Sequence, residues 1–235
     1  MSGDARKTMG FGRREFLGGA LSAAAVGAAT RVGADMISPE PAHAQSAMTP
    51  DEALRALLAG NERFAANKLT SIEHDLTMLK DRNVDKQEPF AAVLACADSR
   101  VPVELVFDQT IGQIFVTRVA GNMVTPEIIA SLEYGAAVLG TKTILVLGHS
   151  YCGAVKAAIA GSAVPGQIGA LFSLIRPAVD QSGGDLETAI KDNAKNHAHI
   201  LATASPLLAG LIKDGKLKIA AGYYALDSGQ VTILG

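Results

Sequence analysis

Two short polar segments contain the residues best suited to bind a metal ion. They are residues 96–100 (Cys-Ala-Asp-Ser-Arg) and residues 148–153 (Gly-His-Ser-Tyr-Cys-Gly). The His-x-x-Cys spacing allows His149 and Cys152 to chelate one zinc ion, and Cys96 can complete a Cys2His set if the two segments are neighbours. Three protein ligands leave a fourth tetrahedral position for water, which is the arrangement of a catalytic zinc rather than a structural one.

Each motif taken alone has an ordinary structural explanation. A buried cysteine usually packs as a small hydrophobe, and Asp-Ser-Arg is common in surface turns that contain an ion pair. The co-occurrence of the motifs favours a metal site, because both cysteines of the chain lie in these two polar segments. A disulfide between Cys96 and Cys152 in an oxidising compartment is an alternative that the sequence leaves open.

Three short apolar runs must position these segments. They cover residues 91–95, 114–119 and 143–147. Each run is bounded by turn residues and lacks polar alternation, which is typical of strands buried on both faces of a parallel sheet. The polar segments follow the first and third runs directly. Because ligands of such sheets bind beyond the carboxyl ends of the strands, we expect the polar segments to meet there.

Helical patterns alternate with the apolar runs. We predict helices over residues 51–66 and 126–139, from residue 152 onward, and over residues 185–213 with a break at Pro206. Residues 67–88 are expected to be irregular or partly helical. Two strands, residues 217–226 and 231–234, close the chain. This order predicts one α/β domain over residues 45–235. Its fold class is a doubly wound, mainly parallel sheet flanked by helices, with an antiparallel last strand.

The composition narrows the function to a small substrate. The chain has 235 residues, of which 49% are hydrophobic and 5% aromatic, with no Trp and a formal net charge of -2. These values give no electrostatic case for nucleic acid and argue against a base-stacking or sugar-binding surface. We expect no stable membrane insertion of the domain over residues 45–235.

The first 44 residues have the features of an export signal. Residues 13–17 (Arg-Arg-Glu-Phe-Leu) form a twin-arginine pattern, a weakly apolar run follows, and residues 42–44 (Ala-His-Ala) provide a small-x-small cleavage site. We therefore predict a signal peptide cleaved after Ala44 and a periplasmic or secreted protein. The alternative is a disordered N-terminal tail.

Together the two motifs resemble those of the β-class carbonic anhydrases, which are Cys-x-Asp-x-Arg and His-x-x-Cys. The resemblance extends to residues 118–122 (RVAGN), 131–134 (SLEY) and 222–231 (GYYALDSGQV). It implies the β-carbonic anhydrase fold and one zinc ion per subunit. By this resemblance the zinc ligands are Cys96, His149 and Cys152, and Asp98 and Arg100 form a catalytic dyad.

The resemblance also implies a substrate pocket and an oligomer. Gln87, Phe115 and Tyr134 fall at positions that shape the carbon dioxide pocket, where Gly153 supplies a backbone N–H. Members of the family are homodimers or higher oligomers, with the pocket built partly by the neighbouring subunit. A subset of the family has a bicarbonate site that uses a Trp three residues before the first zinc cysteine. Val93 occupies that position here, so we expect no such site.

The expected reaction is reversible hydration of carbon dioxide to bicarbonate and a proton by zinc-bound hydroxide. Zinc lowers the pKa of bound water to about 7, Asp98 accepts a hydrogen bond from the zinc-bound group, and Arg100 holds Asp98 ionised and away from the metal. Two alternatives remain: hydrolysis of carbon disulfide or carbonyl sulfide on the same site, and a non-catalytic zinc-stabilised binding domain.

The remaining polar candidates are weaker. His197 and His199 are two residues apart on a predicted helix and face different sides, so they are expected to be packed or solvated rather than metal ligands. His74 is expected at the surface. Asp108 and Gln109 follow a predicted short helix and could form a cap or an interface contact.

Overall fold

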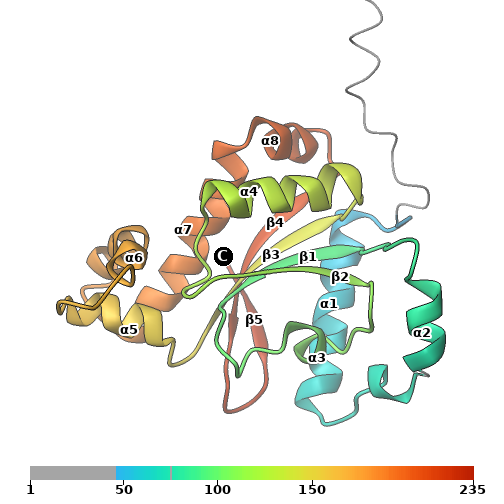
Figure 1. Ribbon diagram of the computed structural model, residues 1–235, viewed down its shortest axis with the longest axis horizontal. Helices are drawn as coiled ribbons and strands as arrows, with labels where there is room; N and C mark the ends of the chain where they lie inside the picture. Colours follow the sequence, from blue (N-terminus) through green and yellow to red (C-terminus); the bar gives the residue numbers. More distant parts are fainter. Residues whose placement is uncertain (1–45, 75) are drawn as a thin grey trace, which may run out of the picture. The chain divides into compact units, whose positions relative to one another are not determined.

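The computed structural model describes residues 46–235 except residue 75, so the predicted signal peptide lies outside the described residues (Figure 1). The described part contains a five-stranded sheet with the order β2-β1-β3-β4-β5. The strands are β1 (Ala91–Ala95), β2 (Ile114–Arg118), β3 (Thr143–His149), β4 (Lys218–Tyr224) and β5 (Val231–Leu234). The first four are parallel and β5 is antiparallel to β4. The predicted fold class is therefore confirmed.

Eight α-helices surround the sheet in the described part of the chain. They are α1 (Pro50–Ala65), α2 (Leu76–Arg82), α3 (Val103–Val106), α4 (Pro126–Glu133), α5 (Gly153–Ala160), α6 (Gly169–Gln181), α7 (Leu186–Ala204) and α8 (Pro206–Lys213). The predicted break at Pro206 is confirmed: Ser205 accepts a hydrogen bond from the backbone N–H of Leu208, and Pro206 is the first residue of α8.

The helix predicted over residues 126–139 changes its geometry part-way. Its last turn, Tyr134–Val138, is π-helical rather than α-helical.

Helix α6 was not predicted at all. It contains Pro177, and a proline normally interrupts a helix by removing a backbone donor. Burial of Ile175, Ala178 and Val179 against its neighbours stabilises α6 despite the proline.

Helices cover both faces of the sheet, and β1 supplies side chains to each face. Ala91, Val93 and Ala95 pack with α1 and α3, whereas Ala92 and Leu94 pack with α4, α7 and α8. The strand is completely buried, as its continuous apolar pattern predicts. A third buried cluster joins α5, α6 and α7 and includes Cys96 and Cys152. No helix of the described residues is both long and apolar enough to span a membrane.

A buried carboxylate fixes the segment between α1 and α2. Asp108 accepts hydrogen bonds from the backbone N–H groups of Thr70 and Ser71 and pairs with Arg63 of α1. Thr70 precedes the 3-10 turn Ser71–Glu73, and Ser71 is its first residue. The Asp108 carboxylate thus bonds another segment rather than a backbone group of α3, the helix that it follows, and an interface role stays a prediction.

Candidate metal centre and active site

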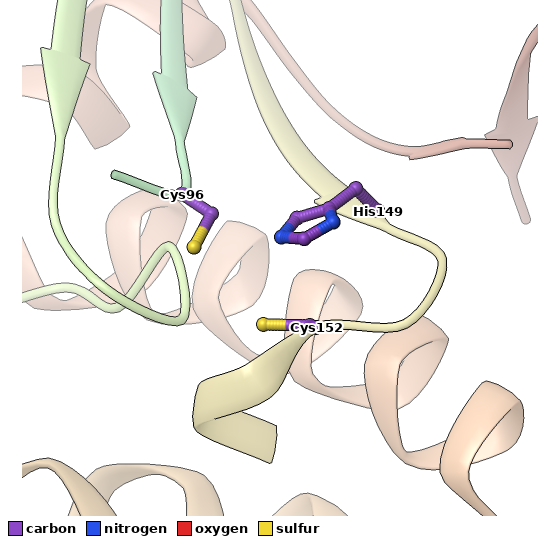
Figure 2. A group of neighbouring side chains, drawn as sticks. All are labelled: Cys96, His149 and Cys152. Atoms are coloured by element: carbon purple, nitrogen blue, oxygen red, sulfur yellow. The ribbon is translucent and has the colours of Figure 1, made fainter. Parts of the chain in front are cut away.

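The carboxyl ends of β1 and β3 bring the three predicted metal ligands together. Ala95 of β1 lies opposite Leu147 of β3, so Cys96, directly after β1, faces the end of β3, where His149 is the last residue. Cys152 is the residue that precedes α5. The ligand atoms of the three residues lie within 4.8 Å of one another, and all three residues are buried (Figure 2).

The orientation of His149 suits a metal ligand. Its Nδ1 lies 3.0 Å from the carbonyl oxygen of Ser150 and therefore carries the proton in the neutral ring. The buried Nε2 has no hydrogen-bond partner among the described residues. Figure 2 shows the ring directed toward the two sulfur atoms. An unpaired buried nitrogen beside two thiols is costly unless it binds something, so the residues present fit a metal ion.

The two thiols interact strongly with each other. A hydrogen bond from Cys152 lowers the pKa of Cys96, burial opposes the shift, and the backbone N–H of Gly121 adds to it. The interaction with Cys96 raises the pKa of Cys152, and burial of Cys152 raises it further. Two thiolates together therefore need a compensating cation. The predicted position of Cys152 at a helix amino terminus is confirmed, since it is the N-cap of α5.

Arg100 holds the carboxylate of Asp98 next to the ligand cluster. The backbone N–H and Nε of Arg100 both donate to Oδ1 at 2.9 Å, and Nη2 donates to Oδ2 at 2.8 Å. These hydrogen bonds keep the pKa of Asp98 well below its usual range. Asp98 Oδ2 lies 3.9 Å from His149 Nε2. The ligand cluster thus has an ionised carboxylate directly beside it.

Arg100 and Arg118 also fix the backbone around this site. Arg100 Nη2 donates to the carbonyl of Tyr151 at 3.4 Å, which links the two polar segments. Arg118, at the end of β2, donates to the carbonyls of Cys96 and Asp98. Sequence reasoning gave Arg118 no role of its own. The feature that could have pointed to Arg118 is its position as the last residue of a predicted strand. From the end of β2, which lies next to β1, its side chain can reach the loop after β1.

The predicted pocket residues do not all lie near the metal ligands of their own chain. The rings of Phe115 and Tyr134 are 6.3 Å apart, and Gln87 and Tyr134 line the same cavity of about 790 Å³. Phe115 pairs with Ala92, four residues before Cys96, which is about 13 Å along the strand. The cavity therefore lies toward the opposite end of β1 and β2 from the ligand cluster.

Gly153 is the one predicted pocket residue that adjoins the ligand cluster. It is the first residue of α5, directly after Cys152, and it is exposed. A Cβ at this position would meet no atom within 4 Å. As one of the first residues of a helix, Gly153 has a backbone N–H without a partner inside α5.

Residues 91–231 match a family model described as carbonic anhydrase. The chain belongs to the carbonic anhydrase family. Among its relatives, carbonic anhydrase 2 of Mycobacterium tuberculosis is 34% identical over 196 residues, covering 78% of this chain and 92% of that protein. A carbonic anhydrase of Pseudomonas aeruginosa is 34% identical over 165 residues, covering 63% of this chain and 74% of that protein.

Solved structures assign this carbonic anhydrase to the β class. A Coccomyxa β-carbonic anhydrase in complex with acetazolamide superposes with a TM-score of 0.61 at 26% identity, covering 77% of this chain and 86% of that one. A tetrameric β-carbonic anhydrase of Sordaria macrospora gives a TM-score of 0.62 at 22% identity, over 78% of this chain and 98% of that one. The second likeness is one of fold alone.

Proposed function

We propose that this protein is a zinc-dependent carbonic anhydrase that converts carbon dioxide and water reversibly into bicarbonate and a proton. The observation that carries the proposal is the cluster of Cys96, His149 and Cys152 with the clamped carboxylate of Asp98 beside it. A structural zinc site uses four protein ligands. Three ligands with an adjacent ionised carboxylate suit a site that keeps one position for a reacting water.

The three ligands and the Asp98–Arg100 pair have separate roles in this proposal. Cys96, His149 and Cys152 would hold the zinc ion. Bound zinc supplies Lewis acidity, which lowers the pKa of a coordinated water to about 7. Two thiolates carry more negative charge than neutral imidazoles and oppose this effect. Asp98 would offset it by accepting a hydrogen bond from the O–H of the reacting group, which turns a lone pair of that oxygen toward the carbon dioxide carbon.

Arg100 keeps Asp98 available for that hydrogen bond. Its guanidinium and backbone N–H bond both carboxylate oxygens, so Asp98 stays ionised and is held beside the three ligands without becoming a fourth one. We expect the backbone N–H of Gly153, which directly follows Cys152, to donate to a substrate oxygen. Both groups are preorganised by the same loops that carry the metal ligands, so little reorganisation is needed during the reaction.

We also propose that the active site is completed by a second copy of the chain. Gln87, Phe115 and Tyr134 lie away from the metal ligands of their own chain, and β2 forms an edge of the sheet. Near this edge Val84, Ile111 and Tyr134 are 75%, 46% and 48% exposed. Apolar side chains exposed together suggest a protein interface. A homodimer that covers this edge would bring the pocket residues of one subunit to the metal centre of the other.

Metal analysis combined with a stopped-flow pH-indicator assay tests the activity. We expect one zinc ion per chain and rapid hydration of carbon dioxide. Asp98→Ala should retain zinc and lose about 10²- to 10⁴-fold in kcat/KM. The control is Asp180→Ala, which removes an exposed aspartate of α6. Zinc-free wild-type protein, or full activity of Asp98→Ala, would contradict the proposal. Carbonyl sulfide and carbon disulfide assayed on the same preparation separate the hydrolase alternative.

We further propose that twin-arginine translocation exports the protein to the periplasm or beyond the cell. The proposal rests on the two arginines at positions 13 and 14 and the Ala-His-Ala site at residues 42–44. Mass spectrometry of exported protein should give an N-terminus at Gln45. Replacing both arginines by lysine should leave the protein in the cytoplasm, and unchanged export of that double variant would count against this route.

A further inference from the structure

The loop of residues 119–124, between β2 and α4, contacts a metal-ligand thiol through its backbone. The N–H of Gly121 donates to Cys96 Sγ at 3.3 Å in a buried environment. Hydrogen bonds from N–H groups disperse the negative charge of a thiolate and orient its sulfur. The position of the Gly121 backbone therefore bears directly on the metal centre.

This loop adopts a conformation that needs support. Gly121 has a φ of 80° and Asn122 a φ of 44°, so two successive residues are left-handed. Asn122 carries a side chain, so this conformation strains its backbone. A Cβ at Gly121 would lie 3.0 Å from Ile175 Cδ1. The hydrogen bond from Asn122 N–H to the carbonyl of Val119, at 2.9 Å, closes the turn but does not fix it against the rest of the protein.

Two side chains of α7 attach the loop to the protein. Asn193 Nδ2 donates to the carbonyl of Gly121 at 2.8 Å, and Val124 N–H donates to His197 Nδ1 at 3.1 Å. Asn193 and His197 are both 1% exposed. They are four residues apart and so lie on the same face of the helix. Their hydrogen bonds hold the loop on both sides of Asn122.

We propose that Asn193 is a positioning residue of the metal centre. By holding the carbonyl of Gly121, it fixes the backbone of that residue so that its N–H points at Cys96 Sγ. His197 supports the same geometry from the far side of the turn. Asn193 touches neither substrate nor metal and acts only through Gly121. This inference rests on the proposed metal binding.

The experiment compares two variants that fill the space of Asn193 without its donor. Asn193→Leu has no polar group, and the thioether of Asn193→Met cannot donate to a carbonyl. The control is Asn196→Leu, because Asn196 lies on the same helix but bonds Gln181 Oε1 at 2.9 Å. Full-length proteins are loaded with Co²⁺ for absorption spectroscopy, and zinc affinity is measured by competition with a chelator. The free energy of unfolding of each metal-free protein is measured in parallel.

Both Asn193 variants should bind zinc about 10- to 100-fold more weakly than wild type and the Asn196→Leu control. Their thiolate-to-cobalt charge-transfer band should move to lower energy, because the Cys96 thiolate loses a donor. An unchanged band and an unchanged zinc affinity would overturn the inference, including when the metal-free variants are less stable, because that result marks a purely structural role. Wild-type protein that binds no metal would instead overturn the proposed function.

Discussion

At the scale of single residues, the pair formed by Asp98 and Arg100 has the clearest consequence for chemistry. Arg100 is half exposed, yet three of its N–H groups converge on one carboxylate. The effect of this contact is therefore better measured by the titration of Asp98 than by protein stability, because water screens an ion pair at such a position.

Removing Arg100 should shift the acid limit of activity. The Arg100 side chain is the main cause of the lowered pKa of Asp98, so Arg100→Ala should let that pKa rise toward its ordinary value of about 3.9 or higher. A carboxylate with a lowered pKa stays ionised until the pH falls through that pKa. Activity of Arg100→Ala should therefore begin to fall at a higher pH than in wild type, as measured by kcat/KM against pH.

Arg100→Lys provides the matched control for this shift. Lysine keeps the positive charge but not the planar fork that engages both carboxylate oxygens. The pH at which kcat/KM of Arg100→Lys falls on the acid side should lie between the values for wild type and Arg100→Ala. If all three profiles coincide on the acid side, Asp98 is not the group whose ionisation matters there.

At the scale of secondary-structure elements, two glycines in helices differ in the space around them. Gly60 lies in α1, and a Cβ there would come within 1.8 Å of the carbonyl oxygen of Phe107. This close approach lets α1 pack onto the segment after α3. Gly210 lies in α8, and a Cβ there would meet no atom within 4 Å.

Replacing each glycine by alanine should therefore change stability in opposite directions. Gly60→Ala forces backbone atoms apart and should lower the free energy of unfolding by about 3 kcal/mol. Gly210→Ala should raise it by up to about 1 kcal/mol, because alanine is the better helix former. Urea denaturation of the two variants and wild type measures both. Equal effects of the two substitutions would show that the contact between α1 and Phe107 is looser than described.

The buried histidine of α7 gives the protein a pH dependence of stability. Burial lowers the pKa of His197 to about 4, although the backbone of Leu174 opposes the effect. In the unfolded chain the pKa is about 6.5, so the unfolded state binds more protons between these two values. Stability from this source is complete above about pH 6.5 and is lost as the pH falls toward 4, by an amount on the order of 3 kcal/mol.

Denaturation of wild type and His197→Gln across this pH range measures that contribution. The glutamine amide oxygen can still accept from Val124 N–H but does not titrate. The variant should lose less stability than wild type between pH 6.5 and 4. His199, which is exposed two residues further on, provides the control as His199→Gln, with an expected slope close to that of wild type. Parallel slopes for all three proteins would mean that His197 is not the source.

At the scale of the whole molecule, the folded chain brings together its only two cysteines. Cys96 and Cys152 are 56 positions apart in the chain, and both are buried free thiols. Their sulfur atoms lie within 4.8 Å of each other. A metal ion that binds both as thiolates also prevents their oxidation, which matters in an oxidising compartment.

Removal of the metal should therefore make the pair sensitive to oxidation. Protein treated with a chelator and then with oxidised glutathione should form a Cys96–Cys152 disulfide with release of reduced glutathione, whereas metal-loaded protein should keep both thiols. Thiol titration and a mass decrease of two hydrogens report the bond. Cys152→Ser cannot form the disulfide and serves as control. Equal oxidation with and without metal would contradict metal protection.

The sequence alone determined those features that depend on short windows. Continuous apolar runs predicted β1, β2 and β3. The spacings within residues 96–100 and 148–153 predicted a three-residue metal site, and the resemblance of these motifs to a family added the Asp98–Arg100 pair. Each of these signals lies within a few residues, where spacing and periodicity are set directly by local backbone geometry.

Only the tertiary structure decided which distant groups meet. The register of β1 against β3 places Cys96 opposite the end of β3, and Asn193 reaches Gly121 across 72 positions. Helix α6 exists because its buried residues outweigh an internal proline. Such contacts depend on the packing of whole elements against one another, and no local pattern encodes that packing. The contact between α7 and the loop beside Cys96 could therefore be found only in the folded chain.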